Sequence, residues 1–188
     1  MKLFIYDTYD EDNREQAEGR FDDDDPDIVA LPAASKEELL AGLDRLVKAN
    51  KVFDRALFQT HGGSGHINFG EKQHIWDITL RDDFKNRQYH TLFPVYTRMY
   101  FDGCEVGQGS EGTKFLEMAG SIFLRLMGGE AFAFTSPGYG FDSWVPFIGG
   151  HTVHFSGSLI KFRFGPGGVR IPDPPPPANT FSFPRFRH

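Results

Sequence analysis

Short apolar runs alternate with amphipathic helical patterns along much of the chain. Residues 35–50 begin with a capping box formed by Ser35 and Glu38, and residues 113–127 carry apolar side chains at helical spacing. Apolar runs typical of buried strands lie at 2–6, 27–31, 55–60, 97–101 and 131–135. Strands that alternate with helices predict an α/β fold, a three-layer sandwich in which helices flank a mainly parallel sheet.

Two segments are less regular. Residues 76–96 give a mixed pattern, in which we expect a helix of irregular length. The polar stretch from Asp7 to Asp25 ends in a run of aspartates, and such a run is usually a solvated loop. A cation site is the alternative interpretation of this acidic stretch.

The last part of the chain changes character. Residues 151–155 and 159–164 predict two short strands joined by Gly157 and Ser158, and residues 172–177 are typical of a polyproline II segment. We therefore divide the chain into an α/β domain, residues 1–165, and a proline-rich C-terminal tail, residues 166–188.

The carboxyl edge of the predicted sheet is where function is expected. Ligands bind beyond the carboxyl ends of the strands in open parallel sheets. The loops that begin at Asp7, His61, Asp102 and Ser136 each follow a predicted strand. We therefore expect these four loops to open on the same edge.

His61 and Cys104 are the leading candidates for chemistry at this edge. Each follows a predicted strand and stands beside glycine. A thiol needs a neighbouring base or positive charge to be an effective nucleophile at neutral pH, and an imidazole supplies one. The alternative interpretation is that Cys104 is a small buried residue and His61 an ordinary loop residue.

His61 and Cys104 lie in the segments FQTHGGSGHINFG at 58–70 and YFDGCEVGQGSEGTKFLEMAG at 100–120. These two motifs resemble those of caspase-like cysteine peptidases, the clan of caspases, gingipains, clostripain and CHAT domains. The greatest similarity is to an uncharacterised bacterial subgroup. The resemblance implies a caspase-like sandwich in which Cys104 is the nucleophile and His61 the base. It also implies that the N–H groups of Gly62 and Cys104 bind the oxyanion of a peptide substrate.

Two other functions compete with a cysteine endopeptidase. The first is a catalytically inactive caspase-like module that binds a protein through its strand-end loops. The second is a metal-binding protein or an unrelated hydrolase, because histidines occur at 61, 66, 74, 151 and 154. His151 and His154 are three residues apart on a strand and would face opposite ways. We therefore predict no metal site and no cofactor.

The candidate substrate pocket is acidic. Its expected walls are the loop after the first strand, with Asp7, and the loop from Ser136 to Trp144, with Asp142. Asp102 and Glu105 flank Cys104. A pocket of this charge predicts preference for lysine or arginine before the scissile bond.

Composition limits the partners and the compartment. The net charge of −6 argues against nucleic acid, and no apolar stretch is long enough for a membrane span. A single cysteine allows no intrachain disulfide, which fits a reducing cytoplasm. The apolar run at residues 2–6 is too short for a signal peptide, although secretion by a signal-free route stays open. We therefore expect a cytoplasmic protein whose partner is a protein or peptide substrate.

Overall fold

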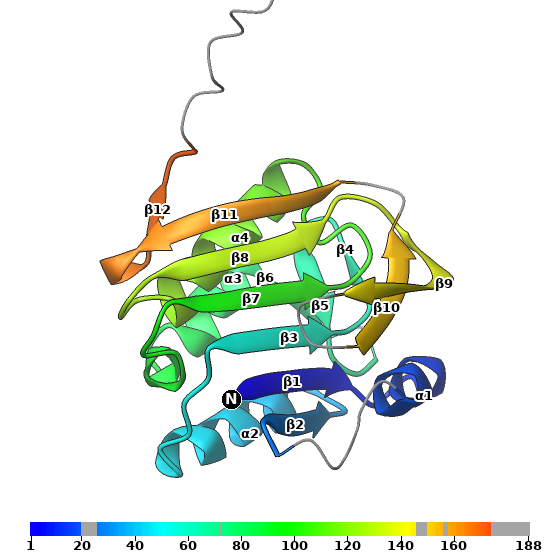
Figure 1. Ribbon diagram of the computed structural model, residues 1–188, viewed down its shortest axis with the longest axis horizontal. Coiled ribbons are helices and arrows are strands. Elements are labelled where there is room, and N and C mark those ends of the chain that lie inside the picture. Colours follow the sequence, from blue (N-terminus) through cyan, green and yellow to red (C-terminus); the bar gives the residue numbers. More distant parts are fainter. Residues whose placement is uncertain (20–25, 72, 146–149, 156–157, 174–188) are drawn as a thin grey trace, which may run out of the picture.

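A seven-stranded sheet forms the centre of this computed structural model, which describes residues 1–19, 26–71, 73–145, 150–155 and 158–173 (Figure 1). The strands lie in the order β12-β11-β8-β7-β3-β1-β2. They are β1 (Lys2–Asp7), β2 (Ile28–Ala33), β3 (Arg55–Gln59), β7 (Thr97–Asp102), β8 (Gly129–Phe134), β11 (Leu159–Gly165) and β12 (Val169–Ile171). Smaller antiparallel sheets consist of β4 (Gly62–Gly63), β5 (His66–Asn68) and β6 (His74–Trp76), and of β9 (Gly138–Val145) and β10 (Gly150–Phe155).

The sheet is mainly parallel, as the alternating pattern predicts. Strands β2, β1, β3, β7 and β8 are parallel, whereas β11 and β12 are antiparallel to their neighbours. Counted along the chain, the five parallel strands have the order 2-1-3-4-5. A sheet with this order binds ligands at its carboxyl edge beside the first and third strands, where the strand order reverses. Here those strands are β1 and β3.

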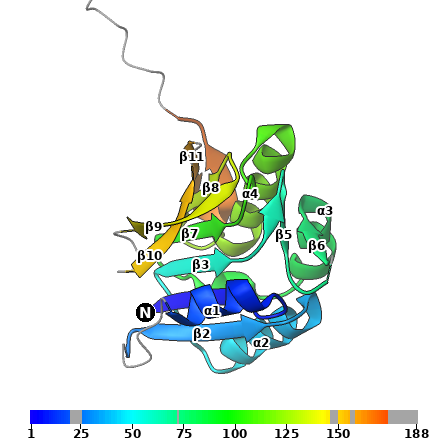
Figure 2. The same cartoon turned by 90° about the vertical axis from the view of Figure 1, so that its right-hand side faces the viewer.

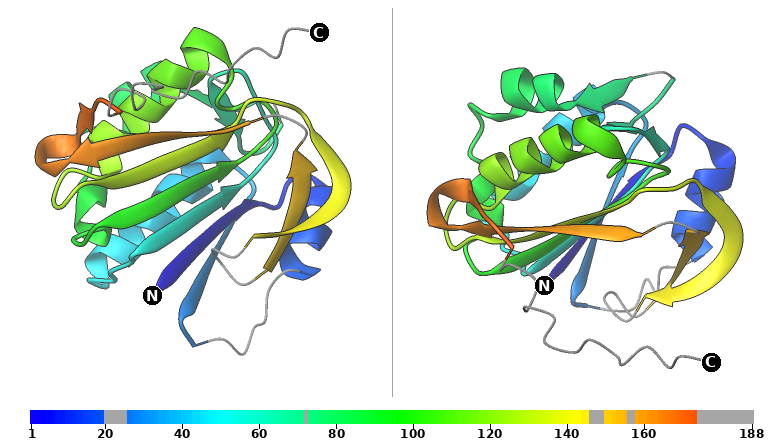
Figure 3. Two further views of the ribbon diagram at one scale, coloured as in Figure 1. Left: turned by 45° about the horizontal axis from the view of Figure 1, so that its top comes forward. Right: turned by 90° about the horizontal axis from the view of Figure 1, so that it is seen from above.

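Helices α2 (Lys36–Lys48) and α4 (Gly109–Phe123) lie on one face of the sheet (Figure 3). The predicted capping box forms at α2, because the Ser35 hydroxyl accepts from the Glu38 N–H at 3.1 Å. The main core lies beneath these helices, and each fully buried phenylalanine there contributes about 1.5–3 kcal/mol. Shorter helical turns on this side are α3 (Asp77–Thr79), η1 (Leu80–Phe84) and η2 (Tyr89–Leu92).

The other face of the sheet is covered differently. Helix α1 (Glu11–Gly19) and the β9–β10 hairpin lie towards its carboxyl edge (Figures 1 and 2). Ala17 of α1 is buried in a small cluster with Phe4, Tyr6 and Leu57 of the sheet. The arrangement, with elements on both faces, is consistent with the expected three-layer sandwich.

The structure differs from the sequence-based expectations in two helices. Residues 11–19 form helix α1 where we expected a loop, because Asp10 caps the helix by accepting from the Asn13 N–H at 2.9 Å. Helix α4 begins at Gly109 rather than at residue 113. Its first turn contains Gly112, whose lack of a side chain lets it pack on the backbone of Gly107. The aspartates at 22–25 lie outside the described residues.

The strands after residue 135 also pair differently. The segment after Ser136 was expected to be a loop, but Gly138–Val145 forms β9 and pairs with β10. Strand β11 instead pairs with β8 in the main sheet. The turn η3 (Pro166–Gly168), with Gly167 at φ +86°, then returns the chain into β12. The sheet therefore continues past residue 165, where we expected the tail to begin, and residues 174–188 lie outside the described part.

Candidate functional site

His61 and Cys104 follow adjacent parallel strands at matching positions. In the register of β3 and β7, Gln59 lies beside Asp102. His61 and Cys104 each stand two residues beyond this pair. Since neighbouring strands are about 4.8 Å apart, the two loops leave the sheet side by side at its carboxyl edge.

The two loops are in close backbone contact just beyond the strands. The Thr60 N–H donates to the Asp102 carbonyl at 3.3 Å. A Cβ atom on Gly62 would lie 2.7 Å from Val106 and 3.2 Å from the Cys104 carbonyl oxygen. The glycine at position 62 is therefore required by the approach of the cysteine loop. This contact brings both expected oxyanion residues, Gly62 and Cys104, to one place.

The loop after β8 supports the cysteine loop from the other side. The N–H groups of Glu105 and Gly107 donate to the carbonyls of Ser136 and Phe134, at 3.0 and 2.8 Å. Glu105 has a left-handed backbone, with φ +58°, so the chain turns sharply directly after Cys104. The loops that carry His61, Cys104 and Ser136 therefore lie next to one another along the carboxyl edge of the sheet. The Cys104 side chain is partly exposed there.

Asp10 contacts the imidazole of His61. The His61 Nε2 atom lies 3.3 Å from the Asp10 Oδ1 atom, and the His61 side chain is 57% exposed. The same oxygen accepts from the Asn13 N–H, and this bond is the main reason that the pKa of Asp10 lies below its usual value. A carboxylate fixed in this way can hold the imidazole in one orientation. The pair lies beside the ends of β1 and β3, where the strand order reverses.

The sequence offered little to single out Asp10. Asp7, Asp10, Glu11 and Asp12 are close together, and the expected loop gave none of them a special position. Asp10 could have been predicted as a helix-capping residue. An aspartate that stands three residues before Asn13, with acidic residues between them in the first helical turn, is typical of a helix start.

Asp7 is buried rather than presented to a pocket. Its exposed fraction is 1%, and its Oδ1 atom accepts from the N–H groups of Tyr9 and Gly70, at 3.2 and 3.1 Å. Its backbone carbonyl accepts from the Asn13 side chain at 2.7 Å. Asp7 therefore ties the loop after β1 to the rest of the edge, which does not favour the substrate-binding role expected for it.

Burial raises the pKa of Asp7 above its ordinary value, although the N–H groups of Gly70 and Tyr9 oppose this shift. A carboxyl group whose pKa is raised on folding stabilises the fold below its unfolded pKa of about 3.9, and this stabilisation is lost as the pH rises through the folded value. The Asp7→Asn variant keeps an acceptor oxygen without the buried charge. We expect its stability relative to the native protein to increase between acidic and neutral pH.

Urea unfolding of both proteins across this pH range measures the effect. Asp27→Asn, which changes an exposed aspartate, is the matched control and should leave the pH dependence unaltered. Parallel stability curves for the native protein and Asp7→Asn would contradict the assignment of a buried, charged Asp7.

The remaining candidate pocket residues are only partly described. Ser136 is half-buried and contributes its carbonyl to the Glu105 N–H. Asp142 lies on β9 with its backbone opposite Val153, but its side chain is outside the described part of the structure. Asp102, at the end of β7, is buried. The expected acidic pocket therefore stays a prediction.

A cluster of aromatic rings lies on the hairpin after His61. The rings of His66 and His74 are 4.6 Å apart between centroids, and Trp76 lies 4.2 Å from His66. Within the described ranges, no three His, Cys, Asp or Glu side chains come together as metal ligands.

No helix among the described residues has the length and apolar character needed to cross a bilayer.

Comparisons with known proteins add no assignment to this geometry. No protein-family model matches the chain, and no curated protein sequence matches it significantly. The functional argument therefore rests on the residues at the carboxyl edge, above all His61, Cys104 and Asp10.

Proposed function

We propose that the protein is a cysteine peptidase with caspase-like architecture, and that His61 and Cys104 are its catalytic dyad. The register of β3 and β7 is the observation that supports this most strongly, because His61 and Cys104, the proposed base and nucleophile, follow these adjacent strands at equivalent positions. The parallel sheet and the order of its strands support the same architecture. This assignment of family rests on the resemblance of the two loop motifs.

The proposed reaction is acyl transfer through a thioester. His61 removes the proton of the Cys104 thiol, and the sulfur attacks the carbonyl carbon of the scissile peptide bond. The N–H groups of Gly62 and Cys104 stabilise the negative charge on the carbonyl oxygen. His61 then gives the proton to the leaving amine, the C–N bond breaks, and water hydrolyses the thioester to release the acid and restore the thiol.

Asp10 has a positioning role in this proposal. Its carboxylate accepts a hydrogen bond from the Nε2–H group of His61, so the other ring nitrogen, Nδ1, is left to take the thiol proton. Because Asp10 is also bonded to the first turn of α1, the direction of this acceptor is fixed by the fold. An oriented base is the arrangement that nucleophilic catalysis requires.

Thiol alkylation tests the dyad without a known substrate. The native protein should react with iodoacetamide near neutral pH faster than a free cysteine, whose pKa is about 8.5. His61→Ala should slow this reaction about tenfold or more, whereas His74→Ala, which removes an exposed histidine of the hairpin that follows His61, should not. Equal rates in the native protein and His61→Ala would favour the inactive binding module.

The substrate preference of this site is a further prediction. Asp142 and Glu105 lie on the segments that border Cys104, so we expect cleavage after lysine or arginine in a peptide library. Asp142→Asn should weaken this preference by about tenfold. Asp7→Asn should leave it unchanged, because Asp7 is buried. Cleavage mainly after aspartate would contradict the charge argument.

A further inference from the structure

Exposed apolar side chains gather at the amino ends of the central strands. Strands β1, β3, β7 and β8 are parallel, so their amino ends lie along one edge of the sheet. In the segments that lead into these strands, six large apolar residues are 40–58% exposed. We call them the amino-edge patch: Met1, Val52, Val95, Tyr96, Leu126 and Met127.

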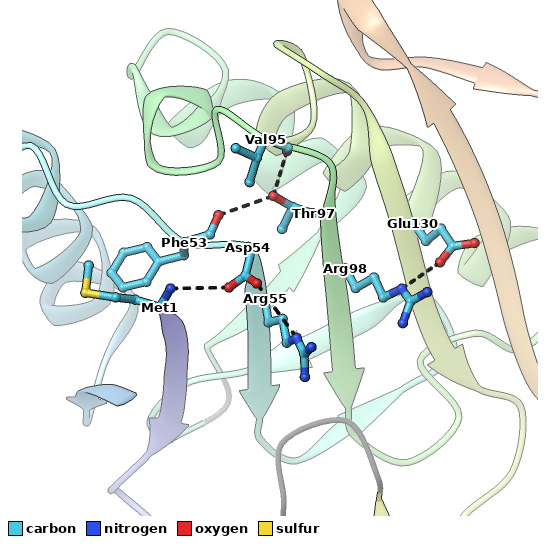
Figure 4. Close-up of polar contacts among 8 residues, drawn as sticks. All are labelled: Met1, Phe53, Asp54, Arg55, Val95, Thr97, Arg98 and Glu130. Atoms are coloured by element: carbon cyan, nitrogen blue, oxygen red, sulfur yellow. Dashed lines mark hydrogen bonds and ion pairs between the residues drawn. The ribbon is translucent and has the colours of Figure 1, made fainter. Parts of the chain in front are cut away.

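Hydrogen bonds hold the segments of the amino-edge patch side by side. The Asp54 N–H donates to the Met1 carbonyl at 3.1 Å, and the Asp54 carboxylate lies 3.4 Å from the Met1 amino group (Figure 4). The Thr97 hydroxyl donates to the Phe53 carbonyl at 3.3 Å (Figure 4). The Thr97 N–H donates to the Gly128 carbonyl at 3.4 Å. The patch therefore lies on adjacent segments of one edge.

The described elements leave this edge uncovered. Helices α2 and α4 pack on one face of the sheet (Figure 3), and α1 and the β9–β10 hairpin lie towards the carboxyl ends of the strands (Figure 1). Single exposed apolar residues are ordinary on a protein surface, whereas a group on neighbouring segments is typical of a contact surface. We therefore asked which segment could cover the patch.

The described chain ends close to the amino-edge patch. In the turn η3, the Gly167 N–H donates to the carbonyl of Arg125, which directly precedes the patch residue Leu126, at 2.7 Å. After β12, the Asp173 carboxylate lies 3.8 Å from Arg163. Arg163 itself lies beside Glu130, the second residue of β8. Residues 174–188 therefore start beside the same edge of the sheet.

The length and composition of residues 174–188 fit the patch. The segment begins with four prolines and carries phenylalanine at 181, 183 and 186. At the polyproline II rise of about 3.1 Å per residue, Phe181 and Phe186 can lie up to about 25 and 40 Å from Asp173. The patch extends from β8 to β1, about 10–24 Å from β12 at the usual strand spacing. The three rings can therefore reach it.

We propose that residues 174–188 dock on the amino-edge patch and cover it with Phe181, Phe183 and Phe186. A segment held on the same chain has an effective concentration of about 1 mM, so a contact with an intrinsic Kd of about 0.1 mM is occupied about 90% of the time. A separate partner would have to bind far more tightly to compete. The patch lies at the opposite ends of the strands from Cys104, so this contact is independent of the proposed peptidase activity.

Trypsin cleavage after Arg185 and Arg187, followed by mass spectrometry, tests the proposal. The full-length Cys104→Ser protein is used, because the proposed peptidase would itself cleave after arginine. A free peptide of residues 174–188 gives the rate for an undocked segment. The segment in the full-length protein should be cleaved about tenfold more slowly, since docking protects it about 90% of the time.

Two double variants in the same background remove the two sides of the contact. Tyr96→Ser/Met127→Ser should raise the cleavage rate to that of the free peptide. Phe181→Ser/Phe183→Ser should do the same without any change in the folded domain, when compared with a peptide of its own sequence. Trp76→Ser is the matched control, because it removes an apolar residue that is 37% exposed on β6, and it should leave the rate unchanged.

Thermal unfolding shows that a faster cleavage is not a loss of fold, and light scattering gives the oligomeric state. A native rate equal to that of the free peptide would overturn the proposal. Protection that persists in Tyr96→Ser/Met127→Ser would also overturn it. A native dimer that this variant converts to a monomer would show that a second copy covers the patch instead. Loss of protection in both double variants of a monomeric protein, with Trp76→Ser unchanged, supports the proposal.

Discussion

Cys104→Ser and His61→Ala should each lower kcat/KM for peptide cleavage by about a thousandfold or more. The nucleophile and its general base act as one unit, so removing either one removes the same step. Fluorogenic peptides with lysine or arginine before the scissile bond provide the assay.

The double variant separates a catalytic unit from two independent effects. If His61 acts only through Cys104, then Cys104→Ser/His61→Ala should be no less active than Cys104→Ser alone. His74→Ala is the matched control, since it removes an exposed imidazole from the hairpin that follows His61. If His61→Ala cleaves the peptide with the same kcat/KM as the native protein, the imidazole has no part in the reaction.

Gly112→Ala should destabilise the protein by about 2 kcal/mol, although alanine is normally the better helix former by about 1 kcal/mol. An added Cβ atom would lie 2.6 Å from the carbonyl oxygen of Gly107, and backbone atoms cannot move aside as a flexible side chain can. Gly107 belongs to the loop that carries Cys104. We therefore expect the rate of Cys104 alkylation to fall about a hundredfold in this variant, because a reacting group that is displaced loses about this much rate.

Gly165→Ala is the control for this substitution. The nearest neighbour of its Cβ atom would be Ile171 at 3.5 Å, which is an ordinary contact. Its stability should stay within about 0.5 kcal/mol of the native protein. Urea unfolding measures both variants, and an equally stable Gly112→Ala would contradict the close packing of α4 on the cysteine loop.

The sequence predicted the parts of the fold that depend on local pattern. The Ser35 cap of α2 and the strands β1, β3 and β7 follow from apolar runs and a capping box, and the structure confirms them. The joint position of His61 and Cys104 at one sheet edge also followed from pattern, because parallel strands share a carboxyl edge.

The parts that were missed depend on contacts between distant residues. Glycines at 107, 109 and 112 argue against a helix by propensity, yet α4 begins at Gly109 because Gly112 packs on Gly107. Asp10 and His61 lie on two different loops, and their spacing in the sequence does not indicate that they are in contact. The pairing of β11 with β8 could likewise not be predicted, because strands with similar apolar patterns do not indicate which of them will pair.

The most direct test of the proposed dyad is mass spectrometry after treatment with a lysine- or arginine-containing peptidyl acyloxymethyl ketone, a reagent that an activated thiol attacks. The native protein should gain one peptide adduct at Cys104. His61→Ala and Cys104→Ser should gain none in the same time, and Asp10→Asn should be labelled more slowly than the native protein. Labelling of Cys104 at the same rate in His61→Ala, or no labelling of the native protein, would contradict the assignment of His61 and Cys104 as a catalytic dyad.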